Sequence, residues 1–197
     1  MKLMTHLNIK LACKLLTAVA LATQITACLP VVVGGAAAGG AMAADRRTTG
    51  VYVEDENIKL KASKNIETAL GEEAHVNITS FKGNVLLTGE VPDENAKIKA
   101  ENTVKAIESV RNVTNELTVG FKTSISSRAN DTYLTSKVKA QFVSENRFQA
   151  NYVKVVTENS VVYLLGYVTQ KEAEDAVDIA RNTSGVTKVV KVFEYMP

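Results

Sequence analysis

The sequence predicts an α+β fold in which one unit, ordered helix, strand, strand, helix, strand, occurs twice. The first observation is an internal repeat. GNVLLTGEV at 83–91 aligns with SVVYLLGYV at 160–168, and SVRNVTNELTV at 109–119 matches GVTKVVKVFEY at 185–195. The second observation is that short runs of β-branched residues alternate with polar segments of helical period. Self-similarity of this kind indicates a duplicated structural unit.

Each unit begins with a helix whose apolar residues recur on one face. These residues are Ile58, Ala62, Ile66, Ala69 and Leu70 in the first unit, and Leu134, Val138 and Phe142 in the second. Two strands follow the helix, and turns at 81–84 and 157–160 join them.

A second helix and a final strand close each unit. The helix follows Asp93 in the first unit and Thr169 in the second, where Thr169 and Glu172 form a capping box. Its apolar residues are Ala96, Ala100, Val104 and Ile107, and then Ala173, Ala176, Val177 and Ala180. We expect the final strands at 113–119 and 186–195. A right-handed crossover then gives a small three-stranded mixed sheet with both helices on one face.

Gly89 and Gly166 occupy the same place near the end of the second strand of each unit. A glycine inside a strand marks a bulge or a close approach of backbone. We interpret both as structural glycines at a bend that lets the next helix fold back over the sheet. A gap that faces a ligand is the alternative.

Residues 1–27 have the features of a lipoprotein signal sequence. Three lysines precede the apolar segment LLTAVALA, which is too short to span a bilayer comfortably. ITAC at 25–28 resembles a bacterial lipobox, which implies cleavage before Cys28 and acylation of its thiol. Leu29, in place of an aspartate, implies retention in the outer membrane. The alternatives are a plain secretory signal with a free Cys28, or one long membrane helix, which Pro30 and the following glycines disfavour.

The expected organisation is a signal peptide at 1–27, a lipidated cysteine and a Gly/Ala-rich tether at 28–50, and the two units at 51–120 and 121–197. The two cysteines of the chain, Cys13 and Cys28, both lie near the N-terminus. The units therefore contain no internal disulfide and no thiolate metal site.

The two units resemble BON domains. The resemblance rests on NDTYLTSKVKAQ, VKVVTENSVVYLLGYVT and SGVTKVV, and on a glycine after VLLT and VVYLL in the two copies. A lipobox followed by two such units is similar to the DolP (YraP) family of outer-membrane lipoproteins. This resemblance implies a lipid-anchored protein on the periplasmic face of the outer membrane.

Nothing in the two units indicates an enzyme. His75 is the single histidine after the N-terminal segment, and we interpret it as a surface residue at the start of a strand. The acidic pairs lie in turns or at helix starts, where carboxylates interact favourably with the helix dipole. We expect no cofactor and no metal. A hydrolase with an unfamiliar site is the remaining catalytic alternative.

Charge differs between the units. Residues 51–120 contain 8 basic and 12 acidic side chains, whereas 121–197 contain 10 basic and 8 acidic. The second unit is thus the one suited to an anionic surface. Nucleic acid is not an expected partner, because the exported part of the chain is not basic overall.

The helix that begins near Asp131 presents a possible contact surface. With Leu134, Val138 and Phe142 facing the sheet, Tyr133 and Val143 are left outside with lysines beside them. An aromatic residue with a polar tip and nearby cations is typical of a membrane interface. Packing of Tyr133 against the first unit, with ordinary solvated lysines, is the alternative.

The family resemblance implies that this helix binds anionic phospholipids such as phosphatidylglycerol and cardiolipin. The predicted site residues are Tyr133, Lys137, Lys139, Val143 and Arg147, of which Tyr133 and Lys139 match positions of the family. The family usually has Trp at the position of Tyr133 and Arg at that of Lys139. The expected function is support of outer-membrane integrity, at division sites in particular. The alternative is a protein-interaction module that docks on an envelope assembly machine or a regulator of cell-wall hydrolases.

Overall fold

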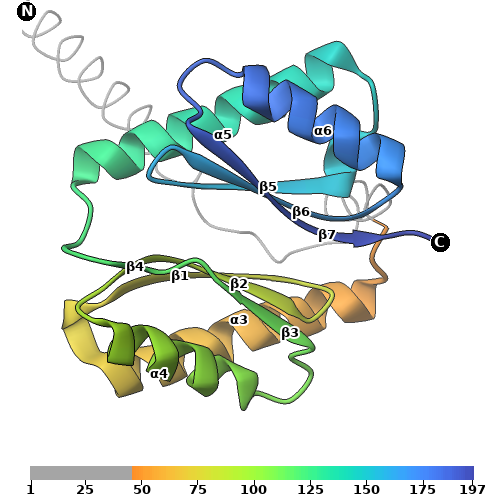
Figure 1. Ribbon diagram of the computed structural model, residues 1–197. Helices are drawn as coiled ribbons and strands as arrows, with labels where there is room; N and C mark the ends of the chain where they lie inside the picture. Colours follow the sequence, from red (N-terminus) through yellow and green to blue (C-terminus); the bar gives the residue numbers. More distant parts are fainter. Residues whose placement is uncertain (1–45) are drawn as a thin grey trace, which may run out of the picture. The chain divides into compact units, whose positions relative to one another are not determined.

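The computed structural model of the protein describes residues 46–197 (Figure 1). The predicted signal sequence, Cys28 and most of the tether lie outside the described residues. Within the described part, no helix is both long and apolar enough to cross a membrane.

The first unit contains two helices and four strands. They are α3 (Thr49–Leu70), a 3-10 turn η2 (Gly71–Glu73), β1 (His75–Phe81), β2 (Asn84–Val91), α4 (Glu94–Lys105), β3 (Asn112–Asn115) and β4 (Thr118–Val119). Helix α3 begins at Thr49, slightly before the predicted start of the unit, because the Thr48 side chain accepts a hydrogen bond from the Val51 amide.

The second unit repeats this order. Its elements are α5 (Ile125–Glu145), a 3-10 turn η3 (Ala150–Tyr152), β5 (Val153–Glu158), β6 (Val161–Val168), α6 (Gln170–Asn182) and β7 (Lys188–Tyr195). Ser124 caps α5, and the predicted capping box of Thr169 and Glu172 opens α6. The α+β class and the order of elements predicted from the sequence are confirmed.

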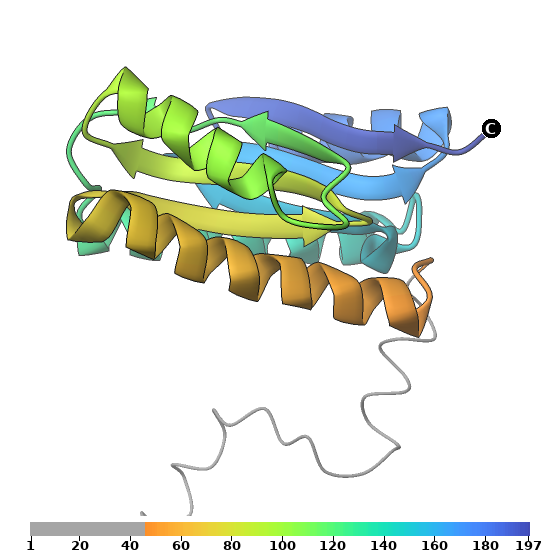
Figure 2. The same cartoon turned by 90° about the horizontal axis from the view of Figure 1, so that it is seen from below.

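Each unit has a small mixed sheet with its two helices on one face (Figure 2). Strands β1 and β2 are antiparallel, as are β5 and β6. Strand β3 is parallel to β2 and β7 is parallel to β6, because a crossover helix lies between the members of each parallel pair.

The predicted final strand of the first unit, 113–119, is wrong as a single element. It divides into β3 and β4, and Leu117 between them is buried in the core. The Asn115 side-chain oxygen accepts a hydrogen bond from the Leu117 amide at 3.2 Å, which takes the chain out of the ladder at that point. In the second unit the final strand is continuous but begins at Lys188, two residues later than expected.

Each unit has its own apolar core between its helices and its sheet. The core of the first unit includes Ile58, Ala62, Ile66, Val85, Leu87, Ala100 and Val104. The core of the second includes Val138, Phe142, Val162, Leu164, Ala173, Ala176 and Ala180. These lists contain most of the apolar positions that helical periodicity assigned to the interior.

The faces of the two sheets that carry no helices pack against each other. Phe81 and Leu86 of the first unit and Tyr163 and Leu165 of the second form a third buried cluster. Strands β2 and β6 are therefore covered on both faces, and their residues are almost all buried. Figure 1 shows the resulting order of helices, sheet, sheet, helices within residues 46–197.

A buried aspartate of the first helix caps the hairpin in each unit. Asp55 of α3 accepts hydrogen bonds from the amides of Lys82 and Gly83 at 2.8 and 3.0 Å. Asp131 of α5 accepts hydrogen bonds from the two equivalent amides, those of Asn159 and Ser160, at 3.0 and 2.8 Å. All four turn residues have positive φ, as expected for a tight two-residue hairpin turn.

Gly89 and Gly166 stand where the backbone of the neighbouring strand approaches closely. A Cβ at Gly89 would lie 2.0 Å from the carbonyl oxygen of His75, and one at Gly166 would lie 2.5 Å from that of Tyr152. Gly89 also has φ +112°, a conformation that side chains rarely allow. Both positions therefore need glycine, because any side chain would collide with the neighbouring backbone.

Candidate functional site

Helix α5 carries Tyr133, Lys137, Lys139 and Val143 of the predicted membrane contact, and Arg147 lies just after its C-cap. Its buried side chains are Asp131, Leu134, Val138 and Phe142, which face the sheet of the second unit. The helix ends at Asn146, whose left-handed backbone (φ 50°) stops it, and whose amide bonds the Phe142 carbonyl. The opposite face of α5 is therefore left to solvent.

Tyr133 and Val143 lie on that outward face. Their relative exposures are 62% and 68%, which are high for large apolar side chains in a folded domain. The alternative that Tyr133 packs against the first unit does not agree with this exposure. Ser136 and Ala140 lie between these two residues on the same face, Ala129 lies one turn before Tyr133, and all three are exposed. The outward face of α5 is thus uncharged along its centre.

The two lysines of α5 lie on different sides of this face. The amino group of Lys137 donates a hydrogen bond to the Ser184 carbonyl at 2.9 Å and lies 6.0 Å from the Tyr133 ring centre. Lys139 is exposed and forms no hydrogen bond or ion pair within residues 46–197. At 100° per residue the two lysines are about 160° apart around the helix, so they flank the apolar stripe.

Arg147 differs from the other predicted site residues because its charge is already paired. Its guanidinium bonds Asp178 at 2.6 Å and also bonds Asp175, and both aspartates belong to α6. These hydrogen bonds, first that from Asp178, raise the pKa of Arg147. The interaction ties the end of α5 to α6.

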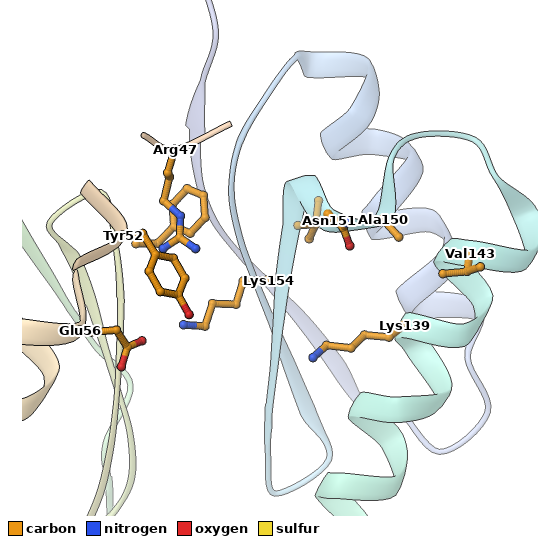
Figure 3. Close-up of a pocket in the computed structure, with 10 residues that line it drawn as sticks. Arg47, Tyr52, Glu56, Lys139, Val143, Ala150, Asn151 and Lys154 are labelled. Carbon is orange, nitrogen blue, oxygen red and sulfur yellow. The ribbon is translucent and has the colours of Figure 1, made fainter. Parts of the chain in front are cut away.

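Lys139 and Val143 also line a hollow between the two units, which has a volume of about 390 Å³ (Figure 3). The first unit contributes Arg47, Tyr52 and Glu56, and the second contributes Lys154 of β5. The hollow lies between the exposed side of α5 and the contact surface of the two sheets.

The cations around this hollow differ in how they are compensated. Arg47 bonds Asp55 at 3.0 Å, and its guanidinium lies 4.4 Å from the Phe81 ring centre. Lys154, by contrast, forms no hydrogen bond or ion pair within the described residues. Burial, and then the nearby charge of Arg47, lower the pKa of the Lys154 amino group. The hollow therefore favours an anion over a cation.

A hydrogen-bonded group joins the units on the opposite side of the seam. Glu90 of β2 accepts a hydrogen bond from Asn159 of the second unit at 3.0 Å and from the linker amide of Thr123 at 3.2 Å. His75 lies 3.0 Å from Glu90 through Nδ1, so it is half-buried rather than the surface residue that the sequence suggested. Burial opposes ionisation of Glu90, but these hydrogen bonds outweigh it and hold its pKa below the usual value.

Glu158 of the second unit completes this group. One carboxylate oxygen accepts hydrogen bonds from Asn77 at 2.8 Å and from Thr88 at 3.2 Å, both in the first unit. The possible ligand atoms of His75, Glu90 and Glu158 lie within 4.8 Å of one another, and no other such group of three is found in residues 46–197. Because protein donors already occupy the carboxylates, we assign the group to the contact between the units.

Sequence reasoning found the α5 residues but missed the interdomain group and the paired hairpin aspartates. Alignment of the two copies contains a signal for the aspartates, since Asp55 and Asp131 both stand three residues before the first buried apolar residue of their helices. No local pattern marks Glu90 or Glu158, because their partners come from the other unit.

Comparison with known proteins gives consistent matches over most of the chain. The BON domain model matches residues 54–120 and 130–197. Outer membrane lipoprotein DolP of Haemophilus influenzae is 42% identical over 171 residues, which cover 86% of this chain and 89% of that protein. The 21 kDa hemolysin of Actinobacillus pleuropneumoniae is 34% identical over 154 residues, covering 77% and 79% of the two chains. Osmotically-inducible protein Y of Escherichia coli is 28% identical over 160 residues.

Proposed function

The chain belongs to the BON-domain family and to the DolP group of outer-membrane lipoproteins within it, and we propose that it binds anionic phospholipid through α5. In this proposal Cys28 is acylated after removal of residues 1–27, and residues 28–50 tether the two domains on the periplasmic face. Binding of lipids such as phosphatidylglycerol and cardiolipin would support outer-membrane integrity, including at division sites.

The observation that carries the proposal is the outward face of α5. Tyr133 and Val143 project from the same helix that buries Leu134, Val138 and Phe142, so α5 has an apolar stripe on both sides. Both side chains of the outer stripe are mostly exposed, and Lys139 beside it has no counterion within the described residues. Apolar side chains with flanking cations match the boundary between headgroups and acyl chains.

The five predicted residues have different roles in this proposal. Tyr133 places its ring among the headgroups with its hydroxyl toward water, and Val143 adds apolar contact. Lys139 supplies an uncompensated charge. Lys137 supplies one that already has a carbonyl partner. Arg147 mainly holds α5 on α6, because two aspartates neutralise it.

Two attachments of different strength explain how a modest contact becomes effective. Each buried methylene of an acyl chain contributes about 0.8 kcal/mol, so two or more chains anchor firmly. Each lysine near an anionic surface contributes about 1 kcal/mol, so α5 alone binds weakly and reversibly. The anchor raises the local concentration of α5 at the membrane, and lipid composition then decides where α5 engages.

Amide shifts in residues 45–197 test the proposal. This portion contains all three apolar clusters, so it retains the interactions that hold the fold. We expect micelles of phosphatidylglycerol to shift amides of 131–147, and micelles of phosphatidylcholine to leave them nearly unchanged. Amides of α3, the equivalent helix, serve as the internal control.

A uniform absence of selective shifts in 131–147 would contradict lipid binding by α5. The protein-interaction alternative would then lead, with the outward face of α5 as a docking surface for an envelope protein. Crosslinking in cells from a photoreactive residue at 133 would distinguish the two, because a lipid contact gives no protein adduct.

A further inference from the structure

Large apolar side chains are also exposed before the proposed lipid contact, where the linker enters α5. Phe121 in the linker is 100% exposed, and Ile125, the first residue of α5, is 85% exposed. Both values exceed that of Tyr133, and Val119 just before them is exposed as well. Folded proteins seldom leave several such side chains together in water unless a partner covers them.

Ile125 lies in line with the outward face of α5, and Phe121 precedes it by four residues in the linker. Ile125 and Val143 are eighteen residues apart, which is five helical turns, so they project in the same direction from opposite ends of the helix. The distance between them along the axis is about 27 Å at 1.5 Å per residue. Tyr133 lies between them, about 80° away around the helix. A flat surface that touches Val143 and Tyr133 therefore also meets Ile125.

The charged residues of the segment that contains Phe121 and Ile125 all have one sign. The segment 117–130 (LTVGFKTSISSRAN) contains Lys122 and Arg128 and no acidic residue. Lys122 bonds the carbonyl of Glu72, and Arg128 bonds the carbonyl of Thr123 at 3.1 Å. Neither cation forms an ion pair with a carboxylate within the described residues. Glu67 and Glu72 line the same hollow as Lys122, so Arg128 is the cation of this segment that is better placed to meet an anionic surface.

We propose that Phe121 and Ile125 form a second membrane-insertion point, so that the linker and all of α5 lie along an anionic bilayer. The proposal rests on the lipid binding proposed for α5 and extends it from the Tyr133 region to the whole helix. Apolar insertion with flanking cations selects an anionic lipid surface, because a protein partner for this segment would need acidic residues arranged around an apolar pocket.

Single tryptophans give a site-specific test, since the chain contains no tryptophan. We would place one tryptophan at a time in residues 45–197 by the substitutions F121W, I125W, Y133W and V143W. Leu60 is an exposed leucine on the equivalent helix α3, and L60W is the matched control. Each variant is titrated with vesicles of phosphatidylcholine, with and without phosphatidylglycerol, and its emission and its quenching by brominated acyl chains are followed.

We expect all four tryptophans on α5 and the linker to shift to the blue and to be quenched to similar extents by the anionic vesicles. L60W should not respond. A response of Y133W and V143W without one from F121W and I125W would overturn the second insertion point while leaving lipid binding by α5 intact. If none of the four responds, the proposed function itself fails.

Affinity provides a second readout that does not depend on fluorescence. Replacing both Phe121 and Ile125 by serine should weaken binding to anionic vesicles by about tenfold or more, because two large apolar contacts are lost. The matched control is Ile98→Ser, which removes an exposed isoleucine of α4 and should leave binding unchanged. An unchanged affinity of the double variant, or a change in its oligomeric state in the absence of lipid, would assign this patch to protein contact instead.

Discussion

Helices α3 and α5 are equivalent elements of the two domains, and they agree on the side that faces the sheet. Ile58, Ala62 and Ile66 of α3 occupy the positions of Leu134, Val138 and Phe142 in α5, and all six are buried. Each helix also has a buried aspartate that accepts hydrogen bonds from the hairpin turn. The requirements of the fold are therefore met in the same way twice.

The two helices differ on the side that faces solvent. The positions of Tyr133 and Val143 in α5 correspond to Asn57 and Glu67 in α3. The place of Lys139 is taken by Ser63. The outer face of α3 is thus polar at the points where α5 is apolar, and α3 belongs to the more acidic domain.

This difference separates residues that specify the fold from residues on which the proposed lipid binding depends. Positions that pack on the sheet or bond the hairpin are kept in type, because both copies need them for stability. Positions on the outer face are free to differ, and the apolar stripe through Tyr133 and Val143 has polar residues at the equivalent positions of α3. Exchanging residues between α3 and α5 tests this interpretation directly.

The largest expected effect comes from the hairpin aspartates. Asp55→Ala should lower the free energy of unfolding by about 3–5 kcal/mol, because it removes a buried carboxylate that accepts hydrogen bonds from two turn amides, from Ser80 and from Arg47. Asp131→Ala should cost less, about 1–3 kcal/mol, since two backbone amides lose their acceptor but no ion pair is broken within the described residues. Urea unfolding of residues 45–197 measures both.

Asp93→Ala provides a reference for these two values. It removes an ordinary cap of α4 at an exposed position, and we expect a cost of about 1 kcal/mol. Equal costs for Asp55→Ala and Asp131→Ala would show that Arg47 adds nothing to the stability of the first hairpin.

The next largest effect is expected from giving α5 the outer face of α3. The double substitution Tyr133→Asn and Val143→Glu should reduce affinity for phosphatidylglycerol vesicles by about a hundredfold, because two apolar contacts are lost and a negative charge is added. Stability should change by less than about 0.5 kcal/mol, since both side chains are exposed. Vesicle co-sedimentation and urea unfolding give the two numbers.

The reverse exchange is the control for this result. Asn57→Tyr with Glu67→Val makes α3 resemble α5 in shape, but the first domain keeps its excess of acidic residues. We expect little gain in vesicle binding. A large gain would mean that the apolar stripe alone determines binding and that the charge of the domain is unimportant.

The sequence predicted much of this fold because its signals are local and occur twice. Helical period placed Leu134, Val138 and Phe142 in the core, and the structure confirms it. The packing of the two sheets was not predicted, although the sequences of β2 and β6 contain a signal for it. Both strands are apolar on successive residues, such as Leu86 and Leu87, which is typical of strands covered on both faces.

The candidate site was predictable only in part. Exposure of Tyr133 and Val143 follows from the position of the buried stripe on the same helix. The pairing of Arg147 with Asp175 and Asp178 does not, because it depends on how α6 crosses α5. The exposure of Phe121 could not be predicted either, since nothing in a linker sequence tells whether an aromatic side chain is buried or exposed.

Smaller losses of vesicle affinity are expected from single substitutions of Lys139 and Arg147. Lys139→Ser copies the residue of α3 and should weaken vesicle binding about fivefold, the contribution of one uncompensated lysine near an anionic surface. Arg147→Ser should weaken it less than about twofold, because two aspartates already neutralise that charge. Surface plasmon resonance on captured vesicles at two salt concentrations measures both. A stronger effect of Arg147→Ser would show that lipid displaces the aspartates.

The smallest expected effect is that low pH weakens the interaction that attaches the end of α5 to α6. A hydrogen bond from Lys171, opposed by burial and aided by Arg147, holds the pKa of Asp175 below its usual value. The pKa of Asp175 is lower in the folded than in the unfolded protein. The pairing therefore contributes its full stability above the unfolded pKa of about 3.9, and this contribution is lost as the pH falls from there through the folded pKa.

The first domain has Ile98 at the equivalent place, so it lacks this carboxylate. The protection factors of amides at 142–147, which correct for the intrinsic pH dependence of exchange, should therefore fall between pH 5 and pH 3 by more than those at 66–71, and Asp175→Asn should remove the excess. An unchanged excess in Asp175→Asn would place the acid sensitivity elsewhere in the second domain.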